Sequence, residues 1–453
     1  MFQLDEYEAG AKDIQLILSE KPASSLTRDN KEFILRRFFD ANWERMIKTH
    51  PRYWQLLQKR GETVSDSSIA EAIEKFTEDD FRDLQVWFNL AWLDPDFIEE
   101  DPAIQALVRK GEGFTEHEKQ IVLAKHLDIV AKVIPLHKEM QDRGQIEVTT
   151  TPFYHPIMPL LYDVNLARIA SPNLELPGEL FAYPVDVEAQ LQMAIKSYED
   201  HFDRKPRGLW PSEQAVGQDI VGLVHDAGFQ WMVSSEGILA RSLGISLRDG
   251  AGNVARPNLL YKPYLVEENG KTVTILFRDI ALSDKVGFSY SGMNGTAAAR
   301  DFMEYLRKVK LDLIGEPGPH IVTIALDGEN CWEYYENDGK EFLHALYTML
   351  DSDPEFKTVT VSEFLKEHPA TAKLPKLFTG SWIDNNLETW IGRKRPHESQ
   401  TRKRWMRLRK HGMSSMQLKA VIGSGGTGMT RIPGKTMPSM SFSGFICKMS
   451  IHT

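Results

Sequence analysis

The stretch from His320 to Tyr335 constrains the fold of this chain more than any other. Residues 321–326 are almost entirely apolar or β-branched, which is typical of a strand buried on both faces. The run ends in Asp327 followed at once by Gly328. An acid at the carboxyl end of a buried strand often has a catalytic role in parallel barrels. The alternative is that Asp327 caps the next helix.

Strand-like and helix-like patterns alternate through the second part of the chain, and this alternation predicts parallel βα units. The strand-like stretches lie near residues 145–151, 206–210, 231–236, 272–277, 321–326 and 358–361. Residues 27–143 show helical spacing instead, including a long helix that we expect Pro135 to interrupt. We therefore expect a mainly helical segment at 1–143, a βα barrel catalytic region at 144–392, and a basic, disordered tail at 393–453.

Polar side chains stand at the ends of the predicted strands, and in a parallel barrel all of these ends meet on one face. They are Glu147, His155, Glu213, Arg278, Asp279 and Asp327. Two carboxylates at an aromatic-rich mouth suit cleavage of a glycosidic bond, since one can attack the anomeric carbon while the other exchanges a proton with the leaving oxygen. Retention of configuration needs the carboxyl groups roughly 5 to 5.5 Å apart. Flat rings on which sugars can stack are supplied by Trp210, Trp332, Tyr334 and Tyr335.

Composition excludes several classes of protein. The chain has two cysteines, too few for a disulfide framework or a zinc cage, and no signal peptide or membrane span is evident. We expect a cytoplasmic protein with no membrane partner. Residues 393–453 carry 13 Lys and Arg and one acid, so this tail is +12, and the total of −10 leaves −22 for the rest. A nucleic-acid arm is one interpretation of such a tail, but we expect no nucleic-acid partner, for the reason given below.

Four motifs, in order, resemble sequence regions of glycoside hydrolase family 57. They are GQIEVTTTPFYHP at 144–156, GLWPSEQAVG at 208–217, LDGENCWEYY at 326–335 and GSWIDNNLETWIG at 380–392. The resemblance implies an α/β fold, an incomplete (β/α)7 barrel followed by a helical region, and a retaining mechanism on α-glucans. It assigns Glu213 as nucleophile and Asp327 as acid/base, and it places His155, Trp210, Trp332 and Trp382 at the sugar subsites. It implies no metal or organic cofactor.

The sequence departs from this family at both ends. The family's first strand carries a His-Gln-Pro motif, which occurs nowhere in this chain, so we expect that strand to be missing. After Gly392 the resemblance stops abruptly. One permitted coding of residues 419–430, read in a shifted frame, gives an aromatic run of the kind the family shows, so we expect a frame-shifted, non-native tail whose positive charge is accidental.

Two alternatives to an active glycosidase or transglycosylase are open at this point. The first is a catalytically inactive family fragment that at most binds glycan. The second is a metal-dependent hydrolase on a related barrel, which would need clustered Asp and His ligands that the sequence does not display.

Overall fold

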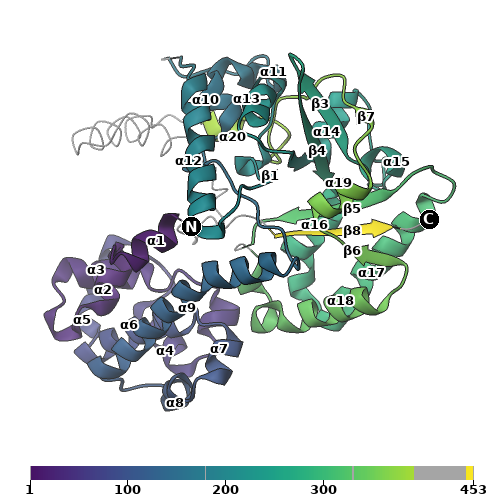
Figure 1. The fold of residues 1–453 in the computed structure, drawn as a ribbon. Coiled ribbons are helices and arrows are strands. Elements are labelled where there is room, and N and C mark those ends of the chain that lie inside the picture. Colours follow the sequence, from purple (N-terminus) through teal and green to yellow (C-terminus); the bar gives the residue numbers. More distant parts are fainter. Residues whose placement is uncertain (1, 179, 329–330, 392–444, 452–453) are drawn as a thin grey trace.

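The structure is a computed structural model that describes residues 2–178, 180–328, 331–391 and 445–451. Figure 1 shows a lobe of helices, coloured purple to blue, beside a body that contains the sheets. The main helices of the lobe are α1 (Phe2–Glu8), α2 (Ile14–Glu20), α3 (Arg28–Arg37), α4 (Pro51–Arg60), α5 (Asp66–Lys75), α6 (Glu78–Leu90), α7 (Pro95–Glu100), α8 (Pro102–Lys110) and α9 (Glu116–Asp142). A π-helical turn, η2 (Trp43–Ile47), lies between α3 and α4.

Side-chain caps fix where several of these helices begin. Thr27, Ser65, Thr77 and Thr115 each form a capping box, so the first turns have partners for backbone N–H groups that would otherwise lack them. The helices bury one apolar face each in a common core. Its largest fully buried members are Phe38, Phe39, Tyr53, Phe81, Trp87 and Phe114.

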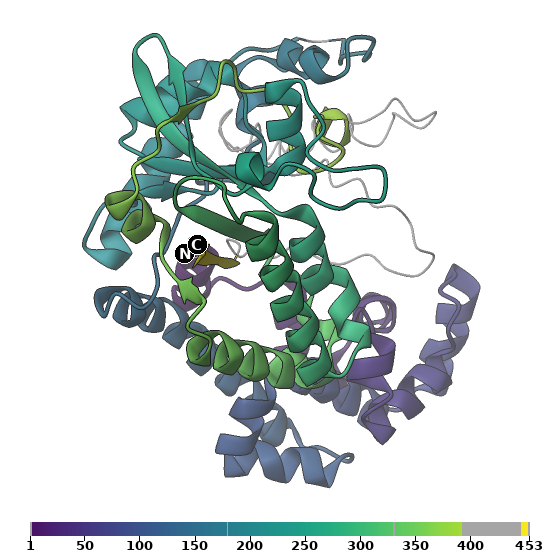
Figure 2. The ribbon, with the colours of Figure 1, turned by 90° about the vertical axis from the view of Figure 1, so that its right-hand side faces the viewer.

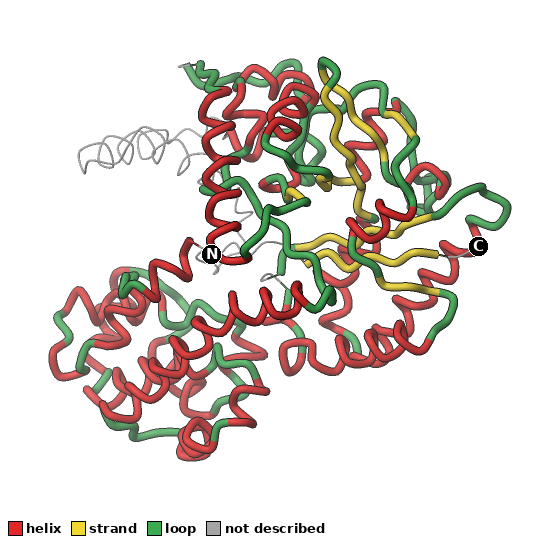
Figure 3. Tube along the Cα trace, viewed as in Figure 1, coloured by secondary structure: helices red, strands yellow, loops and turns green. Residues whose placement is uncertain are grey.

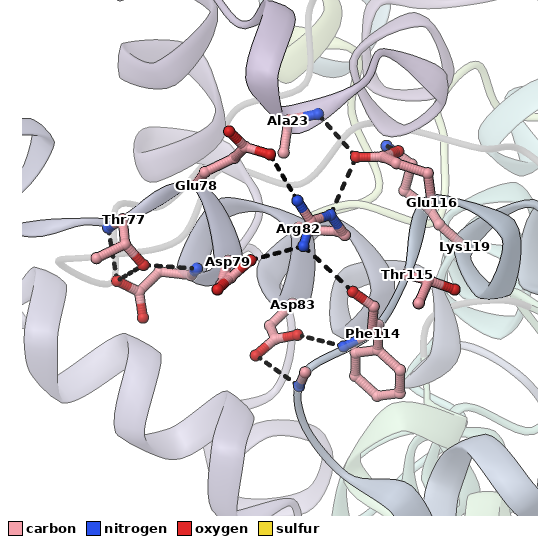
Figure 4. A network of polar contacts seen from close by, with 12 residues as sticks. Ala23, Thr77, Glu78, Asp79, Arg82, Asp83, Phe114, Thr115, Glu116 and Lys119 are labelled. Atoms are coloured by element: carbon pink, nitrogen blue, oxygen red, sulfur yellow. Dashed lines mark hydrogen bonds and ion pairs between the residues drawn. The ribbon is translucent and has the colours of Figure 1, made fainter.

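A polar network ties α6 to the start of α9 (Figure 4). Arg82 on α6 donates to the carboxylate of Glu116 at 3.1 Å and to the backbone oxygen of Phe114 at 3.4 Å. Asp83, one residue later, accepts from the backbone N–H of Phe114 at 3.0 Å. Asp83 also accepts from the backbone N–H of Gly113 at 3.2 Å and pairs with Arg52 at 2.8 Å, and because Asp83 is buried these partners replace the water that its carboxylate loses.

The body contains a five-stranded sheet in the order β1-β2-β4-β3-β7. Figure 3 shows the strands of the body in yellow among the surrounding helices. Its strands are β1 (Gly208–Leu209), β2 (Trp231–Ser235), β3 (Tyr264–Glu268), β4 (Lys271–Arg278) and β7 (Ala372–Lys373). The pairs β1–β2 and β2–β4 are parallel, while β3 and β4 form the antiparallel hairpin that Asn269-Gly270 favours. The parallel pairs bring the carboxyl ends of β1, β2 and β4 to one edge.

Strand β5 (His320–Leu326) continues this arrangement past the end of β4. The backbone N–H of Asp279 donates to the oxygen of Thr323 at 2.9 Å. On its other side β5 pairs antiparallel with β8 (Phe445–Ile451), which also pairs with β6 (Phe356–Thr358). Helices α17 (Gly295–Asp312) and α18 (Lys340–Ser352), which precede and follow β5, pack against one another (Figure 2).

The predicted α/β fold, an incomplete barrel with a large helical insertion near the N-terminus, is confirmed. Helices predominate, the β1-β2-β4 ladder is parallel, and the first part of the chain is helical. The boundaries at 143/144 and 392/393 stay predictions. Seven residues of the tail that we expected to be disordered form β8, because the edge of β5 offers unpaired backbone groups. Residues 393–444 and 452–453 of that tail lie outside the described residues.

Some elements differ from their predicted form. Helix α9 runs through Pro135 to Asp142 without interruption. The predicted strand at 145–151 is reduced to a single bridge between Thr150 and Leu209. None of the helices in the described part of the chain is long and apolar enough to cross a membrane.

Candidate active site

Glu213 lies in a strained turn directly after β1. This turn, η4 (Ser212–Gln214), follows Pro211, and both Glu213 (φ 57°) and Gln214 (φ 50°) adopt the left-handed conformation. Two consecutive non-glycine residues in this region are uncommon and cost conformational energy. The hydroxyl of Ser234 on β2 donates to the backbone oxygen of Gln214 at 2.9 Å. The backbone N–H of Trp382 donates to the backbone oxygen of Glu213 at 3.1 Å. These two contacts hold the strained turn in place.

The carboxylate of Glu213 has two side-chain partners. The indole N–H of Trp382 donates to Oε2 at 2.9 Å, and Nε2 of His155 lies 3.4 Å from Oε1. The Glu213 side chain is 23% exposed, so it is held by its partners yet open to solvent. His155 is itself left-handed, with φ 56°, so a second strained residue faces the first.

Asp327 follows the last residue of β5 and is partly exposed. It does not cap the first described helical turn after the strand, η8 (Trp332–Tyr334), whose N-cap is Cys331. Ala325, two positions earlier, belongs to a small apolar cluster with Trp210, Val233 and Trp382. Asp327 therefore follows, two positions later, a residue that belongs to this cluster.

Arg278, the last residue of β4, links the two halves of this arrangement. Its Nη1 donates to the oxygen of Ala325 at 3.0 Å, and its guanidinium lies 4.9 Å from the centroid of the Trp382 ring. Burial lowers the pKa of Arg278, while nearby carboxylates, first Asp284 and including Asp327, oppose this shift. The cation therefore lies within electrostatic reach of Asp327 and in contact with the tryptophan that holds Glu213.

A comparison with protein-family models decides to which family the chain belongs. A family model described as "Glycosyl hydrolase family 57" matches residues 22–375. The chain belongs to glycosyl hydrolase family 57.

Individual relatives are distant. An alpha-amylase 1 from Dictyoglomus thermophilum is 25% identical over 138 residues, which make up 30% of this chain and only 16% of that relative. A family 57 branching enzyme from Thermococcus kodakaraensis, solved in complex with glucose and additives, has a TM-score of 0.49 at 14% identity, covering 87% of this chain and 80% of its own. The alpha-amylase AmyC from Thermotoga maritima has a TM-score of 0.48 at 13% identity, covering 91% and 86%.

The tryptophans predicted at the sugar subsites of this family 57 chain occupy different positions. Trp210 is 2% exposed and meets Trp382 edge to face, with ring centroids 5.9 Å apart, so its ring supports Trp382 from behind. Trp382 is partly exposed beside Glu213. Trp332 lies on the Asp327 side, where its indole N–H donates to the oxygen of Gly328 at 2.7 Å.

The structure thus brings His155, Glu213, Trp210 and Trp382 together, and Arg278 connects them to β5, after which Asp327 follows. Sequence reasoning noted Arg278 as a polar residue at a strand end but gave it no role. The next residue, Asp279, which the sequence also placed at this strand end, caps α16 (Ile280–Asp284) and is fully buried. No three His, Cys, Asp or Glu residues are grouped to hold a metal ion within the described residues.

Proposed function

We propose that this family 57 chain acts on α-glucans with retention of configuration, with Glu213 as nucleophile and Asp327 as acid/base. The observation that carries the proposal is the position of Glu213. Its carboxylate is fixed by Trp382 at 2.9 Å, sits in a strained turn and remains 23% exposed to an incoming sugar. A carboxylate that is fixed by a donor and still reachable by the substrate has the placement that a nucleophile needs.

The chemistry takes two steps. Glu213 attacks the anomeric carbon, while Asp327 gives its proton to the departing glycosidic oxygen, so that a glycosyl ester forms and the leaving chain is released. Asp327, now ionised, then takes a proton from water or from the hydroxyl of a second glucan, and that oxygen displaces Glu213 from the sugar. Water gives hydrolysis, and a sugar hydroxyl gives transfer. Trp382 and Trp332 offer ring surfaces for the sugars, and His155 lies beside the nucleophile.

The relatives narrow the substrate class. The similar proteins named above are alpha-amylases and a branching enzyme, and we infer an α-glucan substrate for this chain by analogy. The reaction needs no metal or organic cofactor on this proposal.

The test is incubation of the chain with maltoheptaose and with amylopectin, followed by chromatography of the products and by NMR of the first anomer formed. We expect shortened or transferred glucans with the α-configuration, and we expect Glu213→Gln to abolish turnover because the amide cannot form the glycosyl ester. Turnover by Glu213→Gln, or a β-anomer as first product, would contradict the proposal. Binding to immobilised starch without any product would instead support the inactive, glycan-binding alternative.

A further inference from the structure

Arg278 is a buried cation for which the proposed reaction has no direct use. The residue is 8% exposed at the carboxyl end of β4, and its Nε–H finds no hydrogen-bond acceptor among the described residues. A buried charged group with an unfilled donor costs folding free energy. A residue of this kind at the mouth of a site invites a functional explanation.

We propose that Arg278 is a positioning residue that holds Trp382 against Glu213 and, from the same guanidinium, governs the proton exchange of Asp327. The proposal rests on the function proposed above and deepens it, because it makes one side chain responsible for aligning the nucleophile with the acid/base.

The first contact is with Trp382. The Arg278 guanidinium lies over the indole ring at 4.9 Å from its centroid, within the range of a cation–π interaction. Trp210, which is buried, meets the same ring edge to face. Trp382 is therefore in contact with both an arginine and a buried tryptophan, and its indole N–H can keep the 2.9 Å bond to Glu213.

The second contact is with the strand that carries Asp327. Nη1 of Arg278 donates to the oxygen of Ala325 at 3.0 Å. Because Asp327 follows directly after this strand, two residues beyond Ala325, a shift of Arg278 would disturb both Trp382 and the strand end that leads to Asp327.

Four carboxylates, Asp327 among them, share the charge of the Arg278 guanidinium. The acidic groups around it are Asp284 on α16, Asp279 after β4, Glu236 on α14 (Glu236–Leu243) and Asp327 after β5. Arg248 already forms ion pairs with Glu236 at 2.5 Å and Asp279 at 2.9 Å. Asp284 is 3.4 Å from Nη2 but its side chain is 44% exposed, which weakens its pairing.

The reaction uses this charge in its second step. A cation near Asp327 favours the ionised carboxylate that must accept a proton, and it sets the pH at which the carboxyl can still donate one in the first step. At high pH the rate falls because this carboxyl has lost the proton that it must donate, so the high-pH limb of the pH–rate profile measures that ionisation.

The experiment compares the full chain with Arg278→Met and Arg278→Lys on maltoheptaose. Methionine keeps an apolar stem without the charge, so we expect the high-pH limb of kcat/KM to move upward by about one pH unit. Lysine keeps the charge without the planar fork, so we expect the limb to stay while kcat falls about tenfold with little change in KM. A limb that does not move in Arg278→Met, or an unchanged kcat in Arg278→Lys, would overturn the proposal. If the methionine variant does not fold, the lysine variant decides.

Arg60 supplies a matched control in the helical lobe. It too is buried, lies over an aromatic ring (Phe39, 4.7 Å) and donates to a backbone oxygen (Leu35, 3.1 Å). We expect Arg60→Met to lower stability in a comparable way without moving the pH–rate limb.

A second measurement needs no turnover. Carbodiimides react with the protonated carboxyl, so the rate at which Asp327 is labelled, followed by mass spectrometry across pH, reports its proton directly. We expect Arg278→Met to label Asp327 on the order of tenfold faster near neutral pH, and Arg60→Met to match the wild type. If the wild type is inactive but Asp327 is labelled faster in Arg278→Met, the proposed function is refuted and the role of Arg278 stands. If the wild type is active but the labelling rates are equal, the proposed function stands and the role of Arg278 is refuted.

Discussion

At the scale of single residues, backbone strain marks the site. Glu213, Gln214 and His155 are all left-handed, and such strain persists only where surrounding contacts hold it. The motif around Glu213 predicted which residue to examine, whereas its conformation could not be predicted, because it depends on Ser234 and Trp382 from distant parts of the chain. The contact between Arg278 and Trp382 could not be predicted either, because these residues are far apart in the sequence.

The role of Asp327 can be tested with leaving groups. We expect Asp327→Asn to lower kcat/KM on maltoheptaose by roughly 10²- to 10⁴-fold, because the amide cannot protonate the departing oxygen. An aryl maltoside with an acidic phenol should lose far less in the first step. Steady-state kinetics on both substrates measures the difference, and equal losses would refute the assignment.

The bond from Trp382 to Glu213 can be removed without removing the ring. We expect Trp382→Phe to lower kcat by roughly ten- to a hundredfold, because a hydrogen bond to a charged group is worth about 1.5–3 kcal/mol. Trp92→Phe is the control, since Trp92 is an exposed tryptophan of the helical lobe. Kinetics on maltoheptaose measures both variants, and equal activity of Trp382→Phe and wild type would show that the bond is dispensable.

At the scale of elements, the sequence predicted whether a segment is a helix or a strand better than it predicted where that helix or strand begins and ends. Pro135 does not break α9, because the turn around it is exposed and water can satisfy the backbone oxygen that loses its partner. Thr360 caps α19 (Val361–Glu367), and the backbone N–H of Ser362 in its first turn donates to the carboxylate of Glu147. The β-branched run at 145–151 pairs only at Thr150, since strand formation needs partners that propensity cannot supply.

The close contact between β1 and β2 gives a prediction about stability. A Cβ added to Gly208 would lie 2.1 Å from Cζ2 of the buried Trp231 ring, so we expect Gly208→Ala to destabilise the fold by about 1–3 kcal/mol. Gly222→Ala is the matched control. Its nearest atom would be Cδ of Lys271 at 3.6 Å, and within α13 (Val221–Asp226) alanine should stabilise by up to about 1 kcal/mol. Urea unfolding measures both, and equal midpoints would contradict the packing argument.

At the scale of the whole molecule, acidic residues of the helical lobe meet the loop that follows Asp327. Lys340, the first residue of α18, forms ion pairs with Asp96 and, at 3.5 Å, with Glu99. Next to it, burial and then the charge of Asp94 raise the pKa of Asp338 to about 6. The helical lobe is therefore electrostatically coupled to the start of α18 and to Asp338 just before it.

The pKa of Asp338 predicts how stability depends on pH. The folded state holds this proton more tightly than the unfolded chain, so the stabilisation is complete below about pH 4 and is lost as pH rises through about 6. We expect Asp338→Asn to raise the free energy of unfolding at pH 8 by about 1 kcal/mol, after allowance for solvent screening, and to change little at pH 4. Asparagine suits the left-handed φ of 51°. Urea unfolding at both pH values measures this, and a gain of equal size at pH 4 would refute the titration argument.

The pairing of β8 between β5 and β6 has a consequence for handling the protein. The strand that leads to Asp327 has its free edge covered by seven residues from the far end of the chain. A chain cut before Phe445 would present that edge to other molecules, and an uncovered strand recruits neighbouring chains into aggregates. We expect such a shortened chain to lose solubility even though Glu213 and Asp327 are both still present.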